Sequence, residues 1–182
     1  MNFEEWFQHT LEAEGGFVND PDDKGKATIF GITMDSYSEF KGRNVTVDEI
    51  ENMSLEDAEE FYQDYWVNLG LQGIPASIFP YYADAAVNLG KGGATKVLQM
   101  AVNTKMSPTN GNDWIDVDGI RGSGTNQALE AANLTANDYI AELMVWYSNL
   151  VLDGSRYGNR TNQNKFLRGW INRVLNNIKS FS

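Results

Sequence analysis

The sequence predicts a mainly helical α+β fold with one small β-hairpin near its N-terminus. Apolar residues recur at helical spacing in most segments, from Phe3 and Phe7 near the start to Trp170 and Val174 near the end. Glycine and proline instead punctuate the short segment 17–33, which predicts an irregular hairpin. With 182 residues, of which 42% are hydrophobic, the chain can bury a sizeable core as one domain.

The first element is an amphipathic helix over residues 3–14, which Gly15 and Gly16 end. At about 100° per residue, Glu14 lies about 20° from Phe7 around the helix, on the face that packs inward. A carboxyl there lies at the negative end of the helix dipole beside apolar side chains, and both effects favour its protonated form. Glu14 therefore has the environment of a general acid. The alternative is an ordinary last-turn glutamate that faces solvent.

The hairpin over residues 17–33 returns along a strand that begins at Thr28. Its turn carries three carboxylates, Asp20, Asp22 and Asp23. We reject a calcium-loop interpretation, because a lysine and a glycine stand where an EF-hand loop needs ligands. The fold-back of the hairpin should bring the carboxylates and the Thr28 hydroxyl opposite the end of the first helix.

Helices dominate the rest of the chain and are predicted from capping residues and apolar stripes. Thr33 caps a helix through Phe40, and two capping boxes open helices near 47–52 and 55–66. The boxes pair Thr46 with Glu49 and Ser54 with Asp57. Further helices are predicted over about 80–90, 93–103 and 162–179. Thr125 is expected to cap a helix that runs to Ala132, and a capping box of Thr135 with Asp138 opens another.

Composition excludes several classes of function. The absence of cysteine excludes disulfides and thiol nucleophiles. The single histidine, His9, makes a usual zinc site and a Ser-His-Asp hydrolase poor interpretations, and we expect no cofactor and no metal. The net charge of -11 repels phosphate backbones and anionic lipid surfaces, so nucleic acid is excluded as a partner.

The hydropathy pattern predicts a protein that does not insert into membranes. No apolar run approaches membrane-spanning length, and the first helix begins at once, without a basic and apolar leader. We therefore expect a monomer that is made in the cytoplasm without a signal peptide.

The polar residues near the N-terminus suit the chemistry of a glycosidase. Such an enzyme needs an acid that protonates the leaving oxygen, and a second group that activates water or stabilises the oxocarbenium ion. Glu14 is the candidate acid. Asp20, Asp22 and Asp23 are alternatives for the second group, and spacing alone does not choose among them.

Two strings, residues 14–23 (EGGFVNDPDD) and 27–33 (ATIFGIT), resemble the signature of the glycoside hydrolase family 108 N-acetylmuramidases. These enzymes occur in phage endolysins and in bacterial secretion-associated lysozymes. Downstream, residues 84–90, 118–122 and 168–173 resemble segments of the C-terminal region that accompanies this family, a predicted peptidoglycan-binding domain. The resemblance touches nearly the full chain.

The resemblance implies a single lysozyme-like domain over residues 1–182, with a catalytic part at 1–76 and a C-terminal helical part at 77–182 that resembles the peptidoglycan-binding region. It implies hydrolysis of the β-1,4 bond between N-acetylmuramic acid and N-acetylglucosamine, so the expected partner is bacterial peptidoglycan. It also implies action on the cell wall, in the periplasm after release, and for a phage endolysin this release would pass through a holin-made hole. A bacterial secretion-associated lysozyme is the second setting.

Residue by residue, the family's catalytic glutamate falls on Glu14. The aspartate and threonine of the related phage-type lysozymes most nearly match Asp23 and Thr28. Two alternatives stay open: a lytic transglycosylase, which would use the same Glu14 and leave an anhydro-sugar end, and a non-catalytic wall-binding or secretion-helper protein.

Three further residues are candidates for substrate binding. Tyr37 could stack on a sugar ring, although aromatic residues at helical spacing more often belong to the core. Asp84 and Asn88 share one face of a helix and either line the groove or cap and bridge helices. We expect Trp170 to pack structurally, with Arg173 nearby in solvent.

Overall fold

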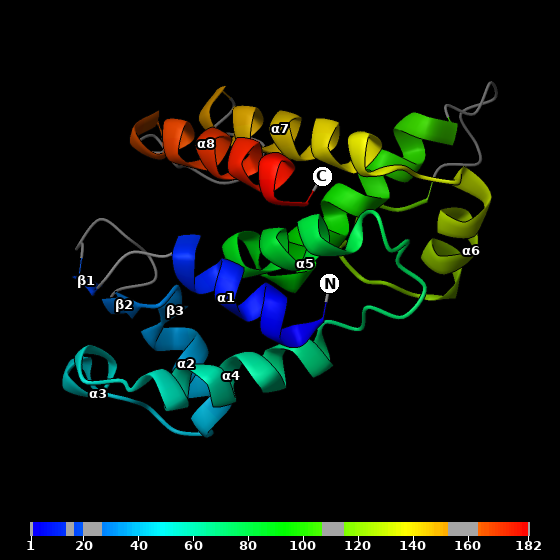
Figure 1. Ribbon diagram of the computed structural model, residues 1–182. Helices are drawn as coiled ribbons and strands as arrows, with labels where there is room; N and C mark the ends of the chain where they lie inside the picture. The colour runs from blue at the N-terminus through cyan, green and yellow to red at the C-terminus, as the bar shows by residue number, and fades with distance from the viewer. Residues whose placement is uncertain (1, 14–16, 20–26, 107–114, 153–163, 182) are drawn as a thin grey trace. The chain divides into compact units, whose positions relative to one another are not determined.

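The computed structural model describes residues 2–13, 17–19, 27–106, 115–152 and 164–181 (Figure 1). Helices make up most of these residues, and a small antiparallel sheet follows the first helix. The mainly helical α+β prediction is therefore confirmed. The chain divides into two compact units, Met1–Gly70 and Leu71–Ser182, and each is treated by itself below. The predicted division of one domain at residue 76 stays a prediction.

The first unit combines four helices with the sheet among its described residues. α1 packs against α4, α3 packs against the middle strand β2, and α2 packs against β3. The elements are α1 (Phe3–Ala13), β1 (Val18–Asn19), β2 (Ala27–Ile29), β3 (Ile32–Thr33), α2 (Met34–Lys41), α3 (Val47–Glu51) and α4 (Leu55–Asn68).

Aromatic rings fix α1 to α4. Trp6 is fully buried, and its ring centroid lies 5.5 Å from that of Tyr62 and 5.0 Å from that of Trp66. Phe3 stacks on Phe7 with centroids 5.6 Å apart. Such ring pairs add to the free energy gained by burying their area. The inward face predicted for the first helix is therefore confirmed at Trp6, Phe7 and Thr10, which are all buried.

The sheet holds three strands in the order β1-β2-β3, one more than the predicted hairpin. β1 pairs with β2 and β2 pairs with β3, both antiparallel, so Thr28 lies opposite Val18 on one side and Thr33 on the other. The third strand arises because the chain turns a second time directly after β2. The expected return strand is thus the central strand of the sheet.

A two-residue turn joins β2 to β3 at Phe30 and Gly31. Both residues have positive φ angles, 52° and 75°, as a type I′ turn requires. A non-glycine residue in this region costs about 1–3 kcal/mol. Tyr62 on α4 offsets this cost because its hydroxyl donates a 2.7 Å hydrogen bond to the Phe30 carbonyl. The turn, and the strand before it, are therefore tied to α4.

We expect the substitution Tyr62→Phe to lower the free energy of unfolding of the first unit by about 1 kcal/mol. The variant keeps the ring packing but leaves the Phe30 carbonyl without its phenolic donor. Urea unfolding followed by tryptophan fluorescence measures the change. Tyr81→Phe is the control, because the Tyr81 hydroxyl makes no hydrogen bond among the described residues. Equal losses for the two variants would contradict the role of Tyr62.

The predicted capping boxes of the first unit are confirmed. Thr46 and Glu49 exchange hydrogen bonds at the start of α3, and Ser54 and Asp57 do so at the start of α4. Thr33 caps α2 by accepting a 3.2 Å hydrogen bond from the Ser36 amide. These boxes satisfy amide groups that the first turn of a helix leaves unpaired.

The second unit holds four helices and no strand among its described residues. α5 packs against α6 and α7, and α7 packs against α8. The elements are α5 (Phe79–Met106), α6 (Ser123–Ala132), α7 (Ala136–Leu152) and α8 (Asn164–Phe181). Among the described helices of the chain, none is both long and apolar enough to cross a membrane.

α5 joins the two helices predicted at 80–90 and 93–103 into one element with a break at Gly90. Gly90 has φ 73° and ψ 160°, a conformation that is essentially restricted to glycine. A built Cβ would meet no atom within 4 Å, so the constraint lies in the backbone and not in crowding. The predicted stop at Gly90 is therefore a kink, after which the helix resumes.

We expect Gly90→Ala to lower the free energy of unfolding by about 1–3 kcal/mol, because alanine is strained in this conformation. Gly169→Ala is the matched substitution, since Gly169 lies inside α8 with open space around a built Cβ. It should raise the same free energy by about 0.5–1 kcal/mol. Thermal and urea unfolding of both variants measure the two signs, and a gain at Gly90 would contradict the kink.

The predicted cap of α6 is wrong. Gly122 is the N-cap, and Thr125 lies inside the helix with 6% of its surface exposed. The cause is a long-range contact, because the buried Gln99 side chain holds the preceding turn. Its amide nitrogen donates to Asp118 at 2.8 Å and to the Thr125 hydroxyl at 3.3 Å, and its oxygen accepts from the Gly119 amide at 2.9 Å. Thr125 thus completes a buried network.

Candidate active site

The two predicted catalytic carboxyls, Glu14 and Asp23, lie outside the described residues, and so do Asp20 and Asp22. The described elements border them in the chain. α1 ends at Ala13, directly before Glu14, and β1 and β2 flank the segment that holds the three aspartates. The roles predicted for these four residues stay predictions.

Thr28, the third predicted catalytic residue, lies at the centre of the sheet on β2. Its Oγ1 atom is buried and has no hydrogen-bond partner among the described residues. A buried hydroxyl without a partner costs about 1–3 kcal/mol, so such groups commonly bind water or a ligand. The hydroxyl is thus available for a contact that the described protein groups do not satisfy.

β2 is held in place from several directions. It pairs with β1 and β3 along its edges. The helix α3, whose Ile50 is fully buried, packs against it. Tyr62 fixes the turn that follows it. The position of Thr28 therefore depends on the core of the first unit and not on a free loop.

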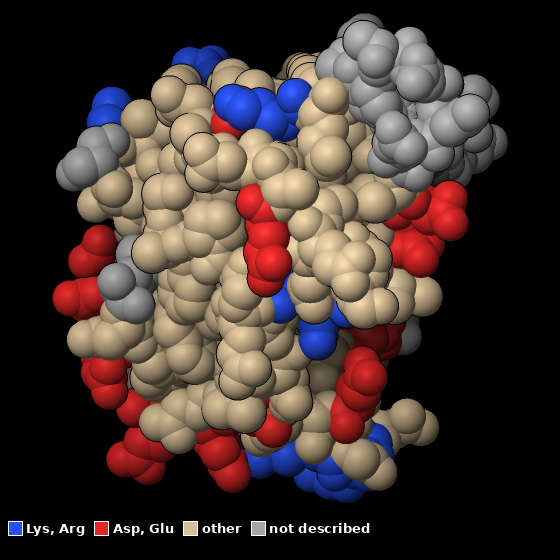
Figure 2. All heavy atoms as spheres, turned by 90° about the vertical axis from the view of Figure 1, so that its right-hand side faces the viewer, with Lys and Arg blue, Asp and Glu red and all other residues tan. Residues whose placement is uncertain are grey.

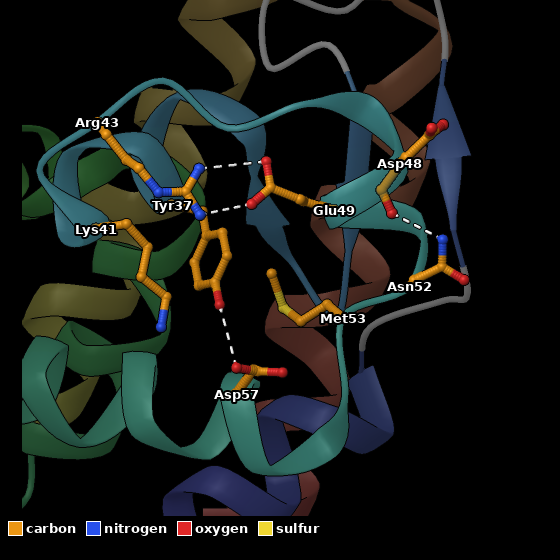
Figure 3. A pocket seen from close by; sticks show the side chains of 8 residues that line it. All are labelled: Tyr37, Lys41, Arg43, Asp48, Glu49, Asn52, Met53 and Asp57. Atoms are coloured by element: carbon orange, nitrogen blue, oxygen red, sulfur yellow. Dashed lines mark hydrogen bonds and ion pairs between the residues drawn. The ribbon is translucent and has the colours of Figure 1, made fainter.

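Tyr37, a predicted substrate-binding residue, borders a pocket of about 450 Å³ beside α2, α3 and α4 (Figure 3). Its ring is 5% exposed and packs against the rings of Phe40 and Phe61 at centroid distances of 5.9 and 6.2 Å. Its hydroxyl donates to Asp57 at 3.4 Å. Tyr37 can therefore offer a ligand its hydroxyl more readily than a ring face. The pocket is lined by Tyr37, Lys41, Arg43, Asp48, Glu49, Asn52, Met53 and Asp57.

Hydrogen bonds favour the ionised form of two carboxylates of this pocket, those of Glu49 and Asp57. Arg43 pairs with Glu49 through two bonds of 2.5 and 3.3 Å, and these bonds with the arginine's charge lower the pKa of Glu49 to about 2. The Ser54 hydroxyl and amide bind Asp57 and lower the pKa of its carboxyl. Burial raises the pKa of Tyr37, so its hydroxyl keeps its proton.

Asp84 and Asn88, the other two candidates for substrate binding, lie on α5. Asp84 is 2% exposed and accepts a 2.9 Å hydrogen bond from Arg173 on α8, whose Nη2 lies 2.8 Å from the same oxygen. Asn88 is exposed, and its amide donates to the Asp84 carbonyl at 3.3 Å. These contacts are those of a helix bridge, and a role of either residue in substrate binding stays a prediction.

The expectation that Arg173 is solvated is wrong. Its side chain is 13% exposed, because it reaches Asp84 across 89 positions of the sequence. Among the described residues, no three histidine, aspartate or glutamate side chains gather closely enough to hold a metal ion.

The fold is that of a lysozyme-like protein. The chain is similar to the solved structure of Brucella abortus SagA, with 27% sequence identity and a TM-score of 0.74 over 98% of this chain and 92% of that one. Residues 7–90 match the model of the family Glycosyl hydrolase 108. The match supports glycoside hydrolase activity on peptidoglycan. No curated protein matches the chain.

The matched segment runs from the first turns of α1 to the kink of α5. It contains Glu14, Asp23 and Thr28, as well as the pocket that Tyr37 borders. The likeness of residues 77–182 to a peptidoglycan-binding region stays a prediction.

Proposed function

We propose that the protein is an N-acetylmuramidase, which cleaves the β-1,4 bond between N-acetylmuramic acid and N-acetylglucosamine. Glu14 protonates the leaving oxygen, and Asp23 positions the attacking water or stabilises the developing positive charge. The observation that carries the proposal is the family match over residues 7–90, which includes both carboxyls and Thr28.

The state of Thr28 supports a place in this site. A glycosidase forms part of its contacts only when sugar and water are bound, so a polar atom near the chemistry can lack a partner in the free enzyme. The Thr28 hydroxyl is such an atom, and the tied turn after β2 limits how far it can move. We infer that it helps to hold the water or a sugar hydroxyl.

The proposed setting is a phage endolysin that is made in the cytoplasm, works as a monomer and reaches the wall through a holin-made hole. Expression in bacteria with and without a holin tests this setting. Lysis that depends on the holin supports it, whereas wall cleavage without any pore-forming partner would favour a secretion-associated lysozyme.

Digestion of purified peptidoglycan with end-group analysis tests the reaction. A muramidase leaves new reducing ends on N-acetylmuramic acid, which reduction with borohydride followed by mass spectrometry identifies. Anhydro-muramic ends would instead show a lytic transglycosylase, and reducing ends on N-acetylglucosamine would show cleavage of the other bond. A folded protein that releases no fragments would favour the wall-binding alternative.

A further inference from the structure

The pocket beside α2, α3 and α4 holds charges of both signs at different places along its wall. Lys41 ends α2, and Arg43 follows it in the chain, while Asp48 lies on α3 and Asp57 on α4. Figure 3 shows the two cations together on one side and Asp48 on the opposite side, with Asp57 below the Tyr37 hydroxyl. A bound molecule would meet a positive wall and a negative wall at once.

Two of these charges are open to a ligand. Arg43 is engaged with Glu49, and Asp57 accepts from Tyr37 and Ser54. Lys41 contacts the Tyr37 side chain and forms a 3.4 Å ion pair with Glu60, and its own side chain is 29% exposed, so its ammonium can accept a further partner. The Asp48 carboxylate has no ion pair or hydrogen bond among the described residues, and it is exposed.

A neutral sugar is a poor match for this arrangement. Sugars gain most from open ring faces and hydroxyl or amide partners, but the Lys41 ammonium lies 5.2 Å from the Tyr37 ring centroid and 5.1 Å from that of Phe40. A molecule with a carboxylate and an ammonium gains contacts with both the Lys41 ammonium and the Asp48 carboxylate. The volume of about 450 Å³ falls within the range of about 300–1,000 Å³ that is typical of small-ligand pockets. These properties fit a short zwitterionic peptide.

Because the protein has a net charge of -11, an anionic ligand can be attracted only where basic side chains lie together. Asp and Glu number 25 against 14 Lys and Arg, and on the face shown in Figure 2 acidic side chains lie in more places than basic ones. A carboxylate-bearing ligand is therefore repelled by most of the protein. It is attracted to the side of the pocket where Lys41 and Arg43 lie together.

The pocket adjoins the strand that carries Thr28. α3 links the two places, because it packs on β2 while its Asp48 and Glu49 side chains line the pocket. A substrate that occupied both places would extend from the sheet over α3.

We propose that this pocket binds the peptide stem of peptidoglycan, with a stem carboxylate at Lys41 and a stem ammonium at Asp48. The inference rests on the proposed function, since peptidoglycan is the substrate that carries sugars and peptides on one polymer. Binding of the peptide makes the enzyme select glycan strands that still bear their stems. Lys41 and Asp48 are thus specificity-determining residues that lie away from the bond that breaks.

The experiment compares kcat/KM on two substrates: purified glycan strands with intact stems, and the same strands after an amidase has removed the stems. The wild-type enzyme should prefer the first. Lys41→Gln and Asp48→Asn should each reduce that preference about two- to fivefold, the effect of losing one partly exposed charge contact, with stripped strands cut at the wild-type rate. Lys179→Gln, on the exposed side of α8, and Glu51→Gln, on α3 outside the pocket, are the matched controls and should change neither rate.

Several outcomes would overturn the inference while leaving the muramidase standing. Equal cleavage of both substrates by the wild type is one, and an equal loss on both substrates in the two variants is another. Cleavage of neither substrate would refute the proposed reaction instead. In that event the peptide is tested directly, by calorimetric titration of the protein with a synthetic stem tetrapeptide that has a free diamino side chain. Binding that weakens in Lys41→Gln and Asp48→Asn supports the pocket, and no binding by the wild type overturns it.

Discussion

The substitution Glu14→Gln is expected to abolish wall lysis and to leave the melting temperature nearly unchanged. Glutamine keeps the shape of the side chain but has no acidic proton to give to the leaving oxygen. General acid catalysis contributes a factor of about 10² to 10⁴ in rate. Turbidity loss of permeabilised cells and release of reducing ends from purified walls measure the activity, and differential scanning calorimetry measures the stability.

Glu12→Gln is the control for this substitution, because Glu12 is an exposed residue of α1 that carries the same charge two positions earlier. It should keep the wild-type rate. A Glu14→Gln variant that retains more than about a tenth of the rate, equivalent to only about 1.4 kcal/mol of barrier, would refute the assignment of Glu14 as general acid.

The second large effect is expected at the buried ion pair of the second unit. Arg173→Met should lower the free energy of unfolding of this unit by about 3–5 kcal/mol, because it leaves the Asp84 carboxylate buried without its partner. Asp84→Leu should cost a similar amount, since it removes the carboxylate that faces the largely buried guanidinium of Arg173. The double variant should recover most of the loss, because neither buried charge then remains.

The exposed pair of Lys105 with Asp138, at 3.1 Å, is the control for burial. Lys105→Met should cost no more than about 1 kcal/mol, since water screens this pair. Urea unfolding followed by far-ultraviolet circular dichroism compares the four variants. Two results would show that the pair is not the buried bridge described above. One is a loss of unfolding free energy in Arg173→Met no larger than that in Lys105→Met. The other is a double variant that is less stable than either single variant.

Most of the helical fold could be predicted because its signals are local. The boxes that Thr46 and Ser54 open depend on partners three residues away, and both are present. The two predictions that were wrong concern side chains whose partners are far away in the sequence. Thr125 was expected to cap α6, but Gln99, 26 positions earlier, draws it into a buried network. Arg173 was expected in solvent, but Asp84 is its partner across 89 positions.

The candidate site could be predicted only in part. The resemblance placed Glu14, Asp23 and Thr28 in one motif, and the family match covers all three. The charged pocket was missed, although one signal was available. Tyr37 and Lys41 are four positions apart on α2 and so share a face, which hinted that the tyrosine would have a charged neighbour and not an open ring.

The kink at Gly90 has a consequence for how such proteins diversify. In an unbroken helix each residue is rotated by about 100° from the one before it. The direction in which an apolar stripe faces is therefore fixed along the whole helix. Gly90 interrupts this regular rotation inside α5, and the family match ends at the same residue. The segment after the break can therefore exchange its sequence, or be replaced by another helix, without rotating the stripe that packs before it. A single glycine conformation thus marks the end of the segment that matches the family and the start of the segment that does not.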